Sequence, residues 1–79
     1  MNIAELQRIL AAHEVRSRAH SIEGSGDDEE QYRLEKDGLL WIVYYYERGD
    51  KVGVREFFTE DEACIYFLKT LLDDPTTRR

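Results

Sequence analysis

Few side chains in this sequence could perform acid–base, nucleophilic or metal chemistry. The only histidines are His13 and His20, and the only cysteine is Cys64. Cys64 falls on the apolar stripe of a predicted helix, where a small buried side chain is a better interpretation than a nucleophile. The sequence has no Cys-x-x-C, no His-Glu-x-x-His and no glycine-rich phosphate loop. We therefore expect a protein that is not an enzyme and that uses no metal and no cofactor.

The remaining side chains that could take part in chemistry form a run of four carboxylates: Asp27, Asp28, Glu29 and Glu30. Paired acids can bind a divalent cation or act on a sugar, but this run lacks the residue spacing of a calcium-binding loop. The preceding Gly24-Ser25-Gly26 cannot serve as a phosphate loop, because the four acids would repel a phosphate. We interpret the segment as a solvated acidic connector.

The composition predicts one small folded domain with an acidic surface. The chain has 79 residues, of which 42% are hydrophobic and 35% charged, and a formal net charge of −6, which favours a single domain over residues 1–79. Negative charge argues against a nucleic-acid partner and fits a basic protein partner, although acidity also simply keeps proteins soluble. One cysteine, no signal-peptide pattern and no apolar run of roughly 20 residues predict a cytoplasmic protein without membrane association.

Two amphipathic helices are predicted at the ends of the chain. The first spans Asn2 to about Ala12, and Asn2 is its expected cap. The second begins after Thr59, whose hydroxyl can form a capping box with Glu62 three positions later. Asp73-Asp74-Pro75 ends this helix, and the tail Thr76–Arg79 is expected to fray.

Four strands are predicted between the helices. A weak strand covers Val15–Glu23. Asp37-Gly38 separates the strand-like runs Gln31–Lys36 and Leu39–Tyr46, and Asp-Gly in this position is typical of a two-residue type I′ hairpin turn. A fourth strand covers Val52–Phe58. The predicted fold is therefore α+β, a four-stranded antiparallel β-meander with N- and C-terminal helices packed on one face, in the order α-β-β-β-β-α.

The predicted hairpin register, with Lys36 opposite Leu39, sorts the side chains of the aromatic strand into two faces. One face is almost entirely apolar and is expected to meet the helices: Tyr32, Leu34, Leu39, Trp41, Val43 and Tyr45. The opposite face is mixed: Gln31, Arg33, Glu35, Leu40, Ile42, Tyr44 and Tyr46. Tyrosine and arginine are typical of protein interfaces, so the mixed face is predicted to bind a partner. Burial in a weak homodimer and plain β propensity are the alternatives.

The run from Trp41 to Cys64 resembles small bacterial immunity proteins of polymorphic and contact-dependent toxin systems. These proteins often show a W-x-V-Y-Y-x-E-R-G strand and turn, followed by an F-x-x-E-x-E-A-C helix start. The matching residues in this chain are Trp41, Val43, Tyr44, Tyr45, Glu47, Arg48, Gly49, Phe58, Glu60, Glu62, Ala63 and Cys64. An upstream strand that ends in Glu23-Gly24, with an acidic stretch after it, extends the resemblance to about two thirds of the chain.

The resemblance implies that the chain binds a cognate secreted toxin domain in the cytoplasm and blocks its active site. Such toxins are often nucleases or NAD-degrading enzymes with basic clefts, where carboxylates can stand in for phosphates and speed association. The predicted partner-binding residues are Asp27, Asp28, Glu29, Glu30, Arg33, Ile42, Tyr44, Tyr46, Glu47 and Arg48. A regulatory or adaptor domain for a basic protein or peptide, or a homodimeric structural protein, is the alternative function.

Overall fold

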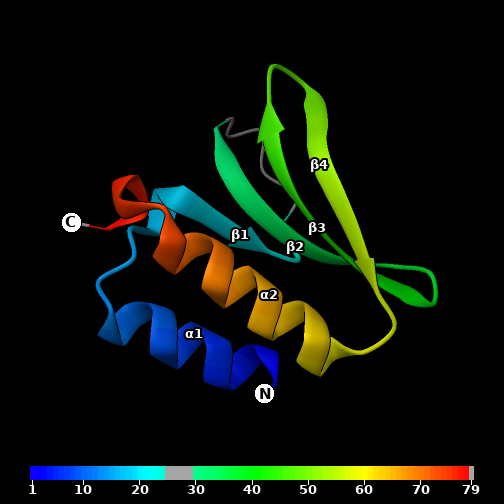
Figure 1. Ribbon diagram of the computed structural model, residues 1–79, viewed down its shortest axis with the longest axis horizontal. Coiled ribbons are helices and arrows are strands. Elements are labelled where there is room, and N and C mark those ends of the chain that lie inside the picture. Colours follow the sequence, from blue (N-terminus) through cyan, green and yellow to red (C-terminus); the bar gives the residue numbers. More distant parts are fainter. Residues whose placement is uncertain (25–29, 79) are drawn as a thin grey trace.

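The computed structural model describes residues 1–24 and 30–78, and the fold is α+β. The elements follow in the order α1 (Ile3–Ala12), the 3-10 turn η1 (Ser17–Ala19), β1 (His20–Ile22), β2 (Gln31–Asp37), β3 (Leu40–Glu47), β4 (Asp50–Phe57), α2 (Glu60–Asp73) and the 3-10 turn η2 (Pro75–Thr77). The strands form one sheet in the order β1-β2-β3-β4 (Figure 1).

The sheet is mixed, so the prediction of an all-antiparallel meander was wrong. β1 runs parallel to β2, with His20 beside Tyr32, whereas β2, β3 and β4 are antiparallel neighbours. Alternation of side chains shows that a segment can form a strand, but it does not report the direction of pairing. The predicted strand Val15–Glu23 is also much shorter, because η1 interrupts it and Val15 instead forms an isolated antiparallel bridge with Arg78.

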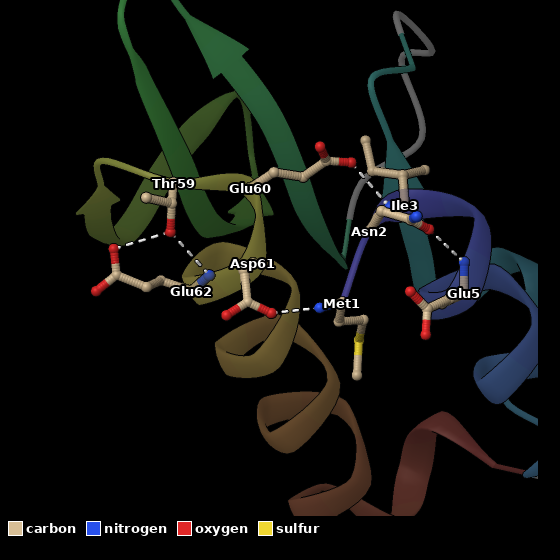
Figure 2. Close-up of polar contacts among 8 residues, drawn as sticks. All are labelled: Met1, Asn2, Ile3, Glu5, Thr59, Glu60, Asp61 and Glu62. Atoms are coloured by element: carbon tan, nitrogen blue, oxygen red, sulfur yellow. Dashed lines mark hydrogen bonds and ion pairs between the residues drawn. The ribbon is translucent and has the colours of Figure 1, made fainter.

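Both helices begin where the capping residues predicted. The Asn2 side chain accepts a hydrogen bond at 2.9 Å from the backbone amide three residues later. Thr59 Oγ1 accepts one at 3.2 Å from the backbone amide of Glu62 and donates to its carboxylate at 2.9 Å. Figure 2 shows that the two helix starts lie close together, because the backbone amide of Ile3 donates to Glu60 Oε2 at 2.9 Å. Local caps and two long-range contacts, this bond and the one from the Met1 amino group to Asp61, therefore align the two helices.

One cluster of buried side chains joins the helices to the sheet. Its members are Leu6 and Leu10 of α1, Val15, Leu34 of β2, Val43 of β3, and Ala63, Cys64, Phe67 and Leu71 of α2. Leu34 and Val43 are direct cross-strand partners. α2 contacts β2, β3 and β4, whereas α1 packs mainly against α2, as Figure 1 shows. Removal of these apolar side chains from water, at roughly 25 cal/mol per Å², is the main force that holds the layers together.

The β2–β3 hairpin is offset by two residues from the predicted register. Trp41 pairs with Lys36 and not with Leu34, because the turn residues are Gly38-Leu39 and not Asp37-Gly38. An offset of two residues keeps each paired side chain on its predicted face, since side chains alternate with a period of two. Leu39 is the exception, because its side chain lies in the turn and is 92% exposed instead of joining the core.

The β3–β4 hairpin contains the type I′ turn that the sequence predicted elsewhere. Its two turn residues, Arg48 and Gly49, have φ angles of 51° and 77°. Positive φ at both central residues defines this turn and matches the twist of the flanking strands. Glycine adopts the conformation without strain, but arginine does not.

A β-bulge interrupts β4 near its middle. The pairing register shifts between Val43 and Tyr45, so that Gly53 and Val54 together face one residue of β3. Gly53 has a φ of 65°, the conformation of a glycine-type bulge. The extra residue places Val52 and Val54 on opposite faces of β4.

The segment after α2 was expected to fray, but it is packed against the N-terminal half of the chain. Pro75–Thr77 forms η2, and Thr77 is buried. The backbone amide of Arg16 donates to the Thr77 carbonyl at 2.7 Å. The chain that leaves α2 therefore closes over the segment between α1 and β1.

Candidate functional site

The mixed face predicted to bind a partner is mostly inaccessible in the free chain. Arg33, Ile42 and Tyr44 are only 7%, 4% and 3% exposed. The structure brings these three residues together on β2 and β3, but little of their surface can be reached by a partner. Among the other predicted contact residues that the structure describes, Glu30 and Arg48 are exposed, and Tyr46 and Glu47 are half-buried.

Charged side chains from neighbouring strands lie over the two tyrosines of this face. The Arg33 guanidinium is 4.0 Å from the centre of the Tyr46 ring, and the Lys51 ammonium is 5.1 Å from that of Tyr44. Lys51 also forms an ion pair with Glu35 at 3.5 Å. Desolvation raises the pKa of the Tyr44 hydroxyl. Each cation–ring contact contributes about 0.5–1 kcal/mol at an exposed site, so these contacts stabilise the domain itself.

The predicted acidic contact residues are only partly described by the structure. Asp27, Asp28 and Glu29 lie outside the described residues. Glu30 is exposed, and its backbone amide donates to the Tyr46 carbonyl at 2.7 Å. One predicted acidic residue and one predicted aromatic residue are therefore held side by side at the start of β2.

Cys64 and His20 are placed as packing groups, whereas His13 is exposed at the end of α1. Cys64 is fully buried in the core, and burial raises its pKa to about 11, so its thiol is protonated at neutral pH. Burial also lowers the pKa of His20, whose Nδ1 lies 3.2 Å from the Arg16 carbonyl. Within residues 1–24 and 30–78, no three or more His, Cys, Asp or Glu side chains gather as a metal site would require.

Two adjoining cavities, which the sequence did not predict, lie where the sheet meets α2 and the segment after it. The first, of about 360 Å³, is polar and is lined in part by Arg16, Arg18 and Asp74. The second, of about 230 Å³, is largely apolar; Val43, Val52, Tyr66 and Thr70 are among its lining residues. Tyr32 and Tyr45 line both cavities, and their rings pack edge to face with centroids 4.8 Å apart. The two cavities together are termed the tyrosine crevice below.

The polar half of the tyrosine crevice is organised by Asp74. Its Oδ2 accepts a hydrogen bond from the Tyr32 hydroxyl at 2.9 Å, and its Oδ1 accepts two from Thr76, at 3.0 Å from the backbone amide and 2.7 Å from the hydroxyl. The bonds from Thr76 and Tyr32 lower the pKa of Asp74. Burial, followed by the bond to Asp74, raises the pKa of Tyr32 to about 12. Both carboxylate oxygens are therefore occupied, and the tyrosine stays neutral.

Two arginines beside the polar half are not paired with carboxylates among the described residues. Arg16 Nη2 donates to the Thr76 carbonyl at 3.1 Å. The ion pairs in the described parts of the chain, Met1 with Asp61 and Lys51 with Glu35, include neither Arg16 nor Arg18. Asp74 and Glu30 line the same cavity, so charged groups of both signs surround the polar half.

Sequence reasoning missed the tyrosine crevice because its walls come from η1, three strands, α2 and η2. The one local signal was Asp74-Pro75-Thr76, since an aspartate before such a pair often forms a turn with its own side chain. That signal predicts a turn but not a cavity.

Comparisons with known proteins found no matching family model, no matching curated protein and no matching solved structure. Neither helix in the described ranges has the length and apolar character needed to cross a membrane.

Proposed function

We propose that this chain binds another protein, and that the partner is a secreted bacterial toxin domain that the chain inhibits as an immunity protein. The single observation that carries the proposal is the set of large apolar side chains exposed along β4 and next to it. Phe58 is 84% exposed, and Val52 and Val54 are each 45% exposed. Apolar side chains gathered on a small domain are typical of a binding surface.

These apolar side chains belong to one edge of the molecule. β4 is an edge strand, because among the described strands it pairs only with β3. Phe57 pairs with Trp41, which places the following residue, Phe58, near the Gly38-Leu39 turn and its exposed leucine. Figure 1 shows the end of β4 and the β2–β3 turn at the same end of the sheet. A partner could therefore contact β4, its end and the neighbouring turn together.

Two further features support a toxin as the partner: the sequence resemblance and the negative charge of the chain. The chain carries a net charge of −6, and a nuclease or NAD-degrading toxin has a basic cleft for phosphates. Opposite charges accelerate association and orient the two proteins as they approach. The acidic run from Asp27 to Glu30 remains the predicted group that enters the cleft.

A second copy of this chain is a less favourable partner for β4. The strand carries the bulge at Gly53 and the charged residues Lys51 and Arg55, and bulges and charges on an edge strand discourage pairing between copies. We therefore favour a different protein over a homodimer.

Co-purification with the toxin domain encoded by the neighbouring gene tests the proposal. We expect a complex with a dissociation constant on the order of nanomolar that suppresses the toxin's nuclease or NAD-degrading activity. Phe58→Ala is expected to weaken the complex about tenfold or more, whereas Gln7→Ala, on the exposed side of α1, should leave it unchanged. If no complex forms, or if the bound toxin stays active, the immunity proposal is wrong. A micromolar complex with an unrelated basic protein would favour the adaptor function instead.

A further inference from the structure

We propose that the chain is anchored on its partner by an apolar tip, formed by Leu39, Leu40 and Phe58, which enters an apolar pocket with a cationic rim. The tip lies where the β2–β3 turn meets the end of β4 (Figure 1), at the end of β2 opposite Glu30. The inference rests on the proposed function, since the pocket belongs to the partner protein. It adds the residues that anchor the complex and the chemistry of the surface that receives them.

The sheet register places the three apolar residues of the tip next to one another. Trp41 pairs with Phe57, and this register, continued by one residue, places Phe58 beside Leu40. Leu39 is the turn residue directly before Leu40. Leu39 and Phe58 are 92% and 84% exposed, more than any other large apolar side chain in the described parts of the chain. Two such side chains gathered at one point are typical of a binding surface.

The fold itself requires neither of these exposed side chains. Gly38 supplies the positive φ of the turn, at 63°, and turn positions usually carry glycine, proline or a small polar residue instead of leucine. Phe58 directly precedes Thr59, the cap of α2. An apolar residue at that position often packs against the first turns of the helix, but the ring of Phe58 remains exposed. Both side chains are therefore available for transfer from water into a pocket of the partner.

Carboxylates dominate the charge around the apolar tip. Asp37 is exposed directly before the turn, and Glu56, two residues before Phe58, is exposed on the same face of β4. Neither carboxylate belongs to an ion pair among the described residues. The nearby cation Lys36 has its ammonium 5.6 Å from the centre of the Trp41 ring. A pocket that receives the tip meets negative charge at its rim, which favours lysine or arginine there.

The same charge decides between the candidate occupants of this surface. In a contact between two copies of the tip, the carboxylates of one copy would face those of the other, and like charges across an interface weaken binding. An anionic membrane would repel the carboxylates in the same way. A basic protein surface complements both the apolar centre and the acidic surroundings, as is usual for an anchor residue inside a polar rim.

Three cyclodextrins test this chemistry without the toxin. β-Cyclodextrin has an apolar cavity that admits a phenyl ring, its amino derivative adds a rim of ammonium groups, and its carboxymethyl derivative adds a rim of carboxylates. In NMR titrations of the ¹⁵N-labelled full chain, we expect saturable shifts at Leu39, Leu40 and Phe58. The dissociation constant should be on the order of 10 mM for the neutral host and about fivefold lower for the amino host. No saturable shift at the tip, or equal binding of the amino and carboxymethyl hosts, would refute the proposal.

Matched variants show whether the position of the charge, and not the net charge, sets the preference for the amino host. Asp37→Lys and Asp73→Lys change the net charge equally, but the exposed Asp73 lies at the far end of α2. Asp37→Lys should remove most of the advantage of the amino host, whereas Asp73→Lys should retain it. Phe58→Ser should weaken binding of the neutral host about fivefold or more, with the exposed Ile65→Ser on α2 as its control. Equal effects within either pair would rule out the tip as the site.

Vesicles and sedimentation test the other two occupants. The chain should not co-sediment with phosphatidylcholine vesicles or with vesicles that contain phosphatidylglycerol, and it should sediment as a monomer at the concentration of the titrations. Co-sedimentation that Phe58→Ser abolishes would assign the tip to a membrane. A dimer that Phe58→Ser dissociates would assign the tip to a second copy. Either result contradicts the proposal.

The toxin complex separates this inference from the proposed function. Leu39→Ser and Asp37→Lys should each weaken the complex about tenfold, and the nearly complete exposure of Leu39 means that its loss should leave the melting temperature unchanged. If the complex forms and inhibits, but both variants bind the toxin as tightly as the wild type, the tip assignment is wrong and the immunity function stands. If no toxin complex forms while the amino host binds at the tip as expected, the immunity function is wrong and the tip remains a site for a different basic protein.

Discussion

The substitution Tyr32→Phe removes one hydroxyl and tests whether a single hydrogen bond fixes the end of α2 against the sheet. The bond runs from the Tyr32 hydroxyl to Asp74 Oδ2 over 2.9 Å and joins β2 to the residue just after α2. The phenylalanine ring can keep the edge-to-face contact with Tyr45. The substitution therefore isolates the hydrogen bond from the packing of the ring.

We expect Tyr32→Phe to lower the free energy of unfolding by about 1 kcal/mol. A hydrogen bond to a charged group contributes roughly 1.5–3 kcal/mol. The pair is only partly buried, so water replaces part of the lost interaction at Asp74 and reduces the effect to about 1 kcal/mol. For a domain of 79 residues, this corresponds to a decrease in melting temperature of about 4–8 °C.

The pH dependence of stability provides a second measurement of the same bond. The pKa of Tyr32 is about 12 in the folded protein, whereas an unperturbed tyrosine has a pKa of about 10. The folded state therefore favours the neutral hydroxyl, and the stability that this contributes is complete below about pH 10 and is lost as the pH rises toward about 12. The wild type should lose stability more steeply than Tyr32→Phe over this range. The pKa values of Tyr44 and Tyr45 are also raised, but these residues titrate in both proteins and cancel in the comparison.

Urea denaturation followed by Trp41 fluorescence, at neutral pH and again near pH 10.5, measures both effects. Tyr45→Phe is the control, because the Tyr45 hydroxyl has no hydrogen-bond partner in the described parts of the chain, and it should change the free energy of unfolding by less than about 0.5 kcal/mol. The reasoning is refuted if Tyr32→Phe unfolds at the wild-type urea concentration, or if Tyr45→Phe is equally destabilising.

Three further predictions concern single residues. Arg48→Asn should raise the free energy of unfolding by about 0.5–1 kcal/mol, because asparagine adopts the φ of 51° found at Arg48 more readily than arginine; a lower melting temperature would contradict this. Cys64 should react with a thiol reagent only after unfolding, since it is fully buried and its pKa is about 11, and fast labelling without denaturant would refute it. Burial lowers the pKa of His20, so the unfolded state takes up its proton first and stability should fall as the pH drops below about 6.5; urea unfolding at pH 7.5 and 5.5 should show a smaller fall for His20→Gln.

The helices could be predicted from the sequence because their signals are local. Asn2 and Thr59 cap the two helices through hydrogen bonds to backbone amides three residues away, and such bonds depend on residue type and spacing alone. The faces of β2 and β3 were also correct, since an error of two residues in the register leaves the alternation intact. The turn position was wrong because Asp37-Gly38 and Gly38-Leu39 both supply the glycine that a tight turn needs.

The candidate site was predicted less well than the fold. The sequence identified the mixed face, but its composition could not show that Arg33, Ile42 and Tyr44 would be almost fully buried. It also assigned Leu39 to the core, although the register leaves that side chain in the turn. Composition reports which side chains are suited to an interface, whereas accessibility depends on neighbours that come from other parts of the chain.

The sequence by itself determined the two helices, the strand-forming runs of β2 and β3, and the composition that predicts partner binding. These features depend on residues within a few positions of one another. Only the tertiary structure decided the parallel direction of β1, the closure of the chain after α2 and the tyrosine crevice. These depend on contacts across long stretches of chain, such as Val15 with Arg78 and Tyr32 with Asp74. The energy of such contacts exists only once the core has brought distant segments together, so no local pattern encodes them.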